Sequence, residues 1–242
     1  NSDHSDPKAL FGFITIKKPV SKGQWIRPTA DDVAKDQLIV QAGTRLNAAT
    51  LGLIASLGVS QLKVAQKPRV ALFSTGDELV MPGDCDPQEL KPGAIFNSNR
   101  FFLKVLLEKA GAVVTDLGIV PDNREKTIQA LQQAAQLHDL VLTSGGVSVG
   151  EEDHIKPAVQ SLGQLDLWQI SMKPGKPFAF GFLQSQASAH SAFFMGLPGN
   201  PVSSFVTFQL LVRPFLLALQ GVSKVHTEPL QLKANFDMPK PD

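Results

Sequence analysis

Four loops of this chain combine glycine or proline with side chains that can bind anions or metal ions. The first runs from Ser74 to Glu78, directly after the apolar run 69–73. Its carboxylates, Asp77 and Glu78, can hold Mg²⁺, which prefers a few acidic oxygens together with water and substrate phosphate. Aspartate also serves at turns and helix caps, so this loop alone leaves a metal-binding and a structural interpretation open.

The second loop, 143–154, is rich in glycine and hydroxyl groups and lies between an apolar run and a helical one. Glycine lets successive backbone N–H groups turn toward one anion, and hydroxyl groups add further donors. The order of residues matches neither of the common phosphate-loop motifs. We favour anion binding over a flexible connection, and Asp153 is either a helix cap or a metal ligand.

The third loop carries Lys173 and Lys176 in the run KPGKP, and the fourth is the run LPGNPVSS at 197–204. Two prolines and a glycine stiffen the lysine loop, so it loses less entropy when it binds phosphate or another oxyanion. Asn200 and Pro201 suit the cap and first turn of a helix, which explains the fourth loop by itself. Free N–H groups at that helix start also attract anions.

Alternating strands and helices must position these loops. After Pro68, apolar runs of strand length alternate with segments whose apolar residues recur at helical spacing. We predict strands at 69–75, 112–120, 140–144, 178–182 and 192–196, and helices at 99–110, 124–137, 153–162 and 201–219. The alternation predicts a three-layer α/β/α fold around a mostly parallel sheet, whose ligand crevice lies beyond the carboxyl ends of the strands.

The two ends of the chain differ from this α/β region. A short strand is predicted at 11–16, and apolar residues predict another at 38–40. A helix is predicted from Asn47 to Leu57, because Gly58 suits its end. Residues 221–242 are polar and contain several prolines, as in a linker or the start of another domain. We therefore expect partial, smaller β-containing segments at both ends.

Composition and charge exclude several classes of protein. Of 242 residues, 43% are hydrophobic and 19% charged, which favours a sizeable core over disorder. The net charge of +1 argues against broad electrostatic binding to nucleic acid or membrane. The single cysteine, Cys85, excludes a disulfide framework and fits a reducing compartment, so we expect a cytoplasmic protein. Arg213 and Pro214 interrupt the most apolar stretch, which predicts no membrane span.

From the residues alone, the chain is an α/β protein with an oxyanion or nucleotide-phosphate crevice and Mg²⁺, and the reaction stays open. The four motifs in their order, however, resemble a known family. They are STGDEL at 74–79, TSGGVSVGEEDH at 143–154, KPGKPFAFG at 173–181 and GLPGNPVSS at 196–204. They are similar to the molybdopterin molybdenumtransferases, the MoeA family, which includes the E domain of gephyrin. The resemblance extends to 42–58 and covers nearly the whole chain.

The resemblance implies an activity, its substrates and its partners. The family inserts molybdate into adenylylated molybdopterin, with Mg²⁺ assisting and AMP released, and so produces molybdenum cofactor. It is a homodimer with its active site where domains of the two subunits meet. Molybdopterin adenylyltransferase is the expected upstream partner, and neither nucleic acid nor membrane is expected as a partner.

The resemblance also implies which residues act. Catalytic roles carry over onto Asp32, Glu78, Asp122, Asp153 and Lys173, and metal contacts onto Asp77, Glu78 and Asp153. Substrate-binding roles are expected for Thr75, Gly76, Ser144, Gly145, Gly146, Ser148, Lys173, Gly175, Lys176, Pro198, Asn200 and Pro201. In these roles, the lysines and loop amides would neutralise molybdate and the pterin phosphate, and the carboxylates would hold Mg²⁺ against the pyrophosphate link.

The chain departs from the family pattern in two respects. Around Asp32 the family often has Arg-x-x-Gly-Glu-Asp, and the run from Arg27 lacks that glycine and glutamate. The resemblance also covers only part of the family's domains: the end of the second domain (1–36), part of the dimerisation domain (37–67), the molybdopterin-binding domain (68–217) and the start of the C-terminal β domain (218–242). We expect the pocket to be kept, with activity and dimerisation impaired relative to the full enzyme.

Three other functions stay open. A molybdopterin adenylyltransferase has a similar layout of its first two motifs, although KPGKP and LPGNPVS favour the molybdenumtransferase. A gephyrin-like scaffold would bind receptor peptides without turnover. A general nucleotide-phosphate-binding module would bind ATP or AMP without any response to molybdate.

Overall fold

The computed structural model describes residues 15, 17–147, 154–185 and 191–237. The chain divides into two compact units, 1–41 and 42–242. In the first unit, the described residues form turns and irregular chain. Every helix and strand of the described residues belongs to the second unit.

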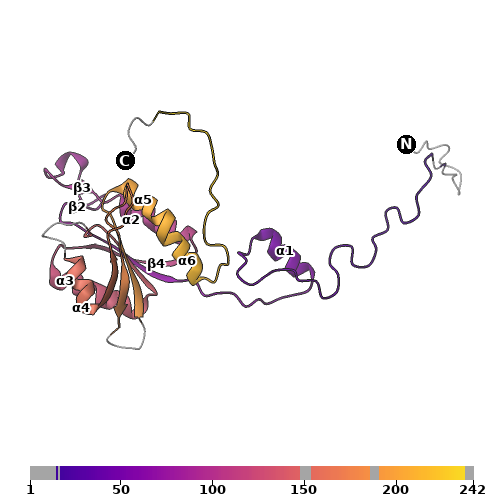
Figure 1. The fold of residues 1–242 in the computed structure, drawn as a ribbon, viewed down its shortest axis with the longest axis horizontal. Coiled ribbons are helices and arrows are strands. Elements are labelled where there is room, and N and C mark those ends of the chain that lie inside the picture. The colour runs from indigo at the N-terminus through magenta and orange to yellow at the C-terminus, as the bar shows by residue number, and fades with distance from the viewer. Residues whose placement is uncertain (1–14, 16, 148–153, 186–190, 238–242) are drawn as a thin grey trace, which may run out of the picture. The chain divides into compact units, whose positions relative to one another are not determined.

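A six-stranded sheet in the order β4-β1-β5-β8-β7-β6 forms the centre of the second unit (Figure 1). The four parallel strands are β1 (Arg69–Thr75), β4 (Val113–Val120), β5 (Leu140–Ser144) and β8 (Ser191–Leu197). The two antiparallel strands are β6 (Gly163–Trp168) and β7 (Ala179–Gln184). The predicted mostly parallel sheet is confirmed.

Helices cover both faces of this sheet (Figure 1). One face carries α2 (Asn99–Lys109) and a continuous helix made of α5 (Pro201–Thr207), a π-helical turn (Phe208–Val212) and α6 (Arg213–Leu219). The other carries α3 (Arg124–Leu137) and α4 (Ile155–Leu162). Side chains of β1 alternate between them: Val70 and Leu72 join the first core, and Ala71 and Phe73 the second. The predicted three-layer α/β/α arrangement follows from this alternation.

The helix from Pro201 to Leu219 is, within the described residues, the one helix long and apolar enough to cross a membrane. Phe208, Val212 and Leu216 are nonetheless buried in the core beneath the sheet. Packing against the sheet therefore accounts for the apolar residues on the buried side of this helix, while Val202, Phe205 and Leu210 are exposed. The π-helical turn directly precedes Arg213 and Pro214, where the proline stands in the first turn of α6.

Short elements complete the second unit. β2 (Leu79–Val80) and β3 (Ile95–Phe96) pair in parallel, and a 3₁₀ turn (Pro87–Glu89) lies in the connection between them. The predicted helix at 47–57 is α1 (Ala48–Ser56), whose cap is Asn47. The Asn47 side chain accepts a hydrogen bond from the Thr50 amide at 2.9 Å.

The structure differs from the predicted elements in three places. The strand predicted at 38–40 is wrong, because no strand of the described residues lies beside this segment and Leu38 is 70% exposed. Strand β6 and the β2–β3 pair were not predicted. The described residues at the two ends, 15, 17–68 and 198–237, contain no strand, and all of the segment 11–16 except Thr15 lies outside the described residues.

Candidate functional site

The site is located by the paths that the chain takes out of two neighbouring strands. β1 and β5 pair side by side. The chain leaving β1 reaches α2 on one face of the sheet, and the chain leaving β5 reaches α4 on the other. Loops that depart to opposite faces leave a crevice between the carboxyl ends of the two strands. The predicted loops 74–78 and 143–154 begin at these two ends.

A cavity of about 270 Å³ lies at these strand ends. Six residues predicted from the sequence line it, namely Thr75, Glu78, Ser144, Gly145, Asn200 and Pro201. Seven further residues complete the lining, namely Leu79, Ile95, Phe96, Asn97, Ser98, Asn99 and Gly199. Loops from β1, β5 and β8 and the start of α2 therefore meet around one space.

Glycine allows the β5 loop to lie against the end of β1. A Cβ added to Gly145 would meet the carbonyl oxygen of Thr75 at 2.6 Å, and one added to Gly146 would meet Thr75 Oγ1 at 2.5 Å. Both glycines have positive φ, at 92° and 65°. The Gly145 amide also donates to Leu197 O at 3.0 Å, which ties the loop to β8. A side chain at Gly145 would push these strand ends apart.

Asn99 joins the start of α2 to the ends of two strands. Its Nδ2 donates to Ser144 Oγ at 2.8 Å and to Gly199 O at 2.7 Å. Asn97 lies two residues earlier, and its Oδ1 accepts from the Arg100 amide at 3.3 Å. Sequence reasoning missed both asparagines because it treated this segment only as the start of an amphipathic helix. Two asparagines directly before such a helix were the available signal.

Several buried polar atoms near the cavity lack a hydrogen-bonding partner among the described residues. They are Ser74 Oγ, Thr75 Oγ1, Asn97 Nδ2, Asn99 Oδ1 and Thr143 Oγ1. Leaving such a group unpaired costs about 1–3 kcal/mol. All five belong to the ends of β1 and β5 or to the start of α2, so this unpaired polarity is concentrated where a polar ligand would relieve it.

Three of the predicted carboxylates gather around the β1 loop. Glu78 lines the cavity, and its carboxylate folds over Gly76, where a Cβ would overlap it. Asp77 accepts a hydrogen bond from the Asp122 amide at 3.1 Å, which brings the loops after β1 and β4 together. The described residues contain no group of three His, Cys, Asp and Glu side chains close enough to hold a metal ion. Two carboxylates completed by water and substrate oxygen are nevertheless a donor set that suits Mg²⁺.

The lysine loop lies against α5. Gly175 is buried, with φ at 118°, and a Cβ there would meet the Thr207 methyl group at 2.7 Å. Lys173, Gly175 and Lys176 line a second cavity of about 470 Å³. Both lysines are exposed, so they add positive charge at the solvent side of this space. The start of α5 lines the first cavity, and Thr207 near the end of the same helix lies against Gly175 of the lysine loop.

The start of α5 is built by the fourth loop. Asn200 caps the helix by accepting from the Ser203 amide at 3.0 Å, and Pro201 follows at the first helical position. Ser204 donates to the carbonyl oxygen of Pro198, which is buried. The predicted helix start is therefore present, and it places three residues of this loop, Gly199, Asn200 and Pro201, on the cavity wall.

Two family profiles match the chain. The one described as "Probable molybdopterin binding domain" matches residues 71–218, and the one described as "MoeA N-terminal region (domain I and II)" matches residues 3–58. The chain belongs to the MoeA family of molybdopterin-binding proteins. The cavity and the lysine loop lie within the first matched range.

Relatives of this MoeA-family chain agree with the match. The chain is 45% identical to a molybdopterin molybdenumtransferase of Haemophilus influenzae over 87% of its length and 50% of the relative's. It is 36% identical to one of Nostoc sp. over 88% and 47%. A crystal structure of a molybdopterin biosynthesis MoeA protein from Pyrococcus horikoshii has 32% identity and a TM-score of 0.68, with 80% of this chain and 46% of that chain covered. The chain thus spans about half the length of the relatives it matches.

Two of the predicted MoeA-family site residues lie outside the part of the chain that the structure describes, and a third belongs to the first unit. Ser148 and Asp153 lie outside the described residues. Asp32 belongs to the first unit, where it and Asp31 form ion pairs with Arg27. The hydrogen bond that Arg27 donates to Asp31, followed by the negative charge of Asp32 and the hydrogen bond donated to it, raises the pKa of the Arg27 guanidinium above its ordinary value.

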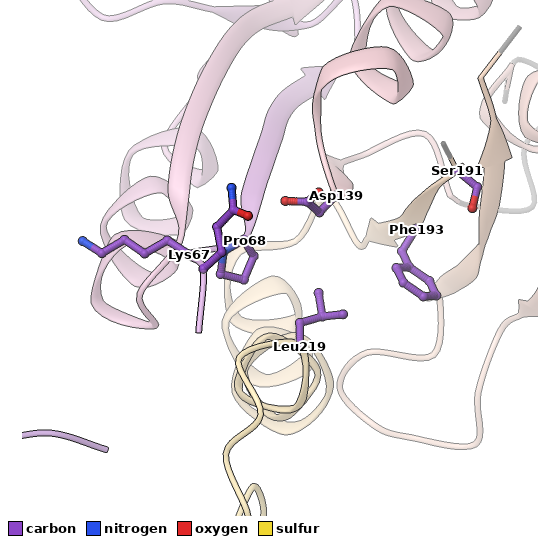
Figure 2. Close-up of a pocket in the computed structure, with 7 residues that line it drawn as sticks. Lys67, Pro68, Asp139, Ser191, Phe193 and Leu219 are labelled. Carbon is purple, nitrogen blue, oxygen red and sulfur yellow. The ribbon is translucent and has the colours of Figure 1, made fainter. Parts of the chain in front are cut away.

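A separate hollow of about 310 Å³ lies at the other end of the strands, where β5 and β8 begin. Figure 2 shows Asp139, Phe193 and Leu219 around it, while the Lys67 side chain extends away. Asp139 is paired with Arg69 at 3.0 Å, and this hydrogen-bonded pair raises the pKa of the arginine. Among the residues that the structure describes, no predicted MoeA-family site residue lines this hollow.

An ion pair holds the start of α2 beside the cavity. Arg100 Nε lies 2.6 Å from each carboxylate oxygen of Asp116 on β4, and both side chains are mostly buried. Arg100 Nη1 also contacts the sulfur of Met81 at 3.0 Å. Because Arg100 follows Asn99 directly, this pair fixes the backbone that presents the asparagine.

We expect Arg100→Met to lower the free energy of unfolding by about 2 kcal/mol, because the largely buried Asp116 carboxylate loses its charged partner and keeps only the hydrogen bond from the Gly118 amide. Urea unfolding would measure this. The matched control is Lys224→Met, which removes a fully solvated partner of Glu228 and should cost less than about 0.5 kcal/mol. Equal effects of the two substitutions would contradict the role given to Arg100.

Proposed function

We propose that this chain is the molybdopterin-binding part of a molybdopterin molybdenumtransferase. In the proposed reaction, molybdate is inserted into the dithiolene of adenylylated molybdopterin and AMP is released, which gives molybdenum cofactor. Support comes from the membership of the MoeA family and from the names of the Haemophilus and Nostoc relatives.

The observation that carries this proposal is the cavity at the ends of β1 and β5, with its unpaired buried polar atoms. Such a space suits a ligand that offers many hydrogen bonds, as a pterin nucleotide does. The neighbouring lysine loop adds positive charge for phosphate or molybdate. A polar ligand would thus occupy the first cavity, and an oxyanion would bind at the lysine loop.

Roles follow from position. The anionic groups would be neutralised by Lys173 and Lys176 together with the amides of the glycine loop at 145–146. The wall of the pocket would be shaped by Pro198 and Pro201. Glu78, Asp77 and Asp153 would hold Mg²⁺, with Asp122 and Asp32 as further acidic residues of the full site. When bound, Mg²⁺ would supply Lewis-acid activation of the pyrophosphate link. The protein's own contribution is mainly to hold the dithiolene sulfurs next to molybdate.

The proposal also covers the domains to which the chain belongs, the oligomeric state and the cellular location of the full-length protein. We infer that 1–36 and 37–67 belong to the family's second and dimerisation domains, that 68–217 is the molybdopterin-binding domain, and that 218–242 begins the C-terminal domain. The full-length protein would be a cytoplasmic homodimer that receives its substrate from a molybdopterin adenylyltransferase. Multi-angle light scattering of the full-length protein would test the dimer.

AMP release tests the reaction. The full-length protein is mixed with adenylylated molybdopterin, Mg²⁺ and molybdate, and AMP is measured with and without molybdate. We expect release that requires molybdate and that is lost when a chelator removes Mg²⁺. The 242-residue chain is measured in parallel, because it spans about half the length of its relatives.

Other results would favour the other functions. ATP-dependent adenylylation of molybdopterin would identify an adenylyltransferase instead. Micromolar binding of a receptor-derived peptide, without molybdate insertion, would favour a gephyrin-like scaffold. Binding of AMP that is insensitive to molybdate, with no release by the full-length protein, would leave a general nucleotide-binding module.

A further inference from the structure

Asn97 and Asn99 line the same cavity, and each has one amide atom without a hydrogen-bonding partner among the described residues. Asn97 is 2% exposed and Asn99 is 7% exposed. Asn97 Nδ2 and Asn99 Oδ1 are buried, and neither has a partner among the described residues. Both residues line the cavity of about 270 Å³. The wall of this cavity therefore contains two amide groups with unused hydrogen-bonding capacity.

The hydrogen bonds of the other amide atoms determine which atom is left unused. Asn97 Oδ1 accepts from the Arg100 amide, so an acceptor must stand there and the donor Nδ2 is the remaining atom. Asn99 Nδ2 donates to Gly199 O, which can only accept, so the acceptor Oδ1 remains. Neither amide can be flipped without placing two acceptors or two donors against each other.

We propose that Asn97 and Asn99 together bind the edge of a heterocycle that carries an adjacent acceptor and N–H donor. The ligand acceptor would take the Asn97 Nδ2 hydrogen, and the ligand N–H would donate to Asn99 Oδ1. This inference deepens the proposed function, because the choice of heterocycle rests on the proposed substrate.

Two heterocycles of that substrate offer the required edge. The pterin ring carries a carbonyl acceptor beside a ring N–H, and adenine carries a ring nitrogen acceptor beside an amino donor. Both ring systems share the same chemistry at this edge, so the two arms of the experiment use them separately. The probes are pterin itself and AMP.

Asn97→Asp is the decisive variant. It keeps the shape and the oxygen that accepts from the Arg100 amide, and a carboxylate at a helix start is electrostatically favourable, so folding is expected to be kept. It replaces the unused donor by an acceptor, which would repel the ligand acceptor. Asn99→Ala is the second variant, and it removes the unused acceptor.

Asn47→Asp is the matched control. Like Asn97, Asn47 accepts a hydrogen bond from the backbone amide three residues later, which here is that of Thr50 at the start of α1. Asn47 does not line the cavity. Calorimetric titration of the 242-residue chain with each probe gives the affinities, and thermal unfolding verifies that each variant is folded. We expect Asn97→Asp and Asn99→Ala each to weaken binding of one probe about tenfold, and Asn47→Asp to change it less than about twofold.

The outcomes distinguish the pterin from the adenine as the bound heterocycle, and they distinguish this inference from the proposed function. Weakening of pterin binding alone assigns the edge to the pterin, and weakening of AMP binding alone assigns it to adenine. Wild-type affinity of Asn97→Asp for both probes, or no binding of either probe by the wild-type chain, would overturn the inference. Molybdate-dependent AMP release by the full-length protein, measured separately, decides the proposed function whichever way the titrations fall.

Discussion

Glu78→Gln is expected to lower the rate of molybdate-dependent AMP release at least about 100-fold, which corresponds to about 2.7 kcal/mol of transition-state stabilisation. Glu78 is the one predicted metal contact that lines the cavity within the described residues. The substitution keeps the size of the side chain and removes its charge. Without that charge, Mg²⁺ would be held more weakly at the pyrophosphate link.

The position of Glu78 makes this loss specific. The backbone carbonyl of Glu78 accepts from the Ile95 amide at 2.8 Å, so the β2–β3 pair holds the residue in place whatever its side chain. The rate is measured over a range of Mg²⁺ concentrations, and partial recovery at high Mg²⁺ would support the metal-holding role.

The matched control is Glu89→Gln, which removes an exposed carboxylate from the 3₁₀ turn between β2 and β3. It should leave AMP release unchanged. A Glu78→Gln enzyme within about threefold of the wild-type rate would refute the role proposed for this carboxylate.

Gly145→Ala should lower the free energy of unfolding by about 3–4 kcal/mol and abolish ligand binding in the cavity. Its positive φ strains any other residue, and the added Cβ would meet the backbone oxygen of Thr75, which cannot rotate away. Urea unfolding gives the stability, and titration with AMP and pterin gives the binding.

Gly118→Ala separates backbone strain from steric overlap. Gly118 on β4 also has a positive φ, at 82°, but nothing lies within 4 Å of where its Cβ would stand. We expect a loss of about 1–2 kcal/mol for this control. If the two substitutions cost the same, the close approach of the β5 loop to β1 would not be a structural requirement.

The sequence predicted the strands and helices whose apolar pattern is complete. β1 and β5 are continuous apolar runs because both of their faces are buried, and α3 shows helical spacing because one face packs on the sheet. The apolar run at 38–40 looks the same, but a strand needs a neighbour, and the pattern says nothing about whether one is present. Strand β6 has an alternating pattern at the sheet edge, which a single sequence does not distinguish from a loop.

The site was predicted where residue type alone carries the signal. Acidic, glycine-rich and lysine loops after apolar runs led to Glu78, Gly145 and Lys173. Asn97 and Asn99 were missed because their role depends on long-range contacts. Asn99 joins Ser144, 45 positions away, to Gly199, 100 positions away, and no local pattern encodes this.

The long sequence separations between Asn99 and its two hydrogen-bonding partners affect the order in which the protein folds. Contacts between residues far apart in the chain form late, because the entropy of closing a long loop is lost before the contact stabilises anything. β6, β7 and β8 follow one another and pair with their neighbours, whereas the hydrogen bonds of Asn99 require that segments from α2, β5 and β8 have already assembled. We therefore expect the cavity to be completed late in folding, and a ligand bound there would report that β1, β5, β8 and α2 have assembled.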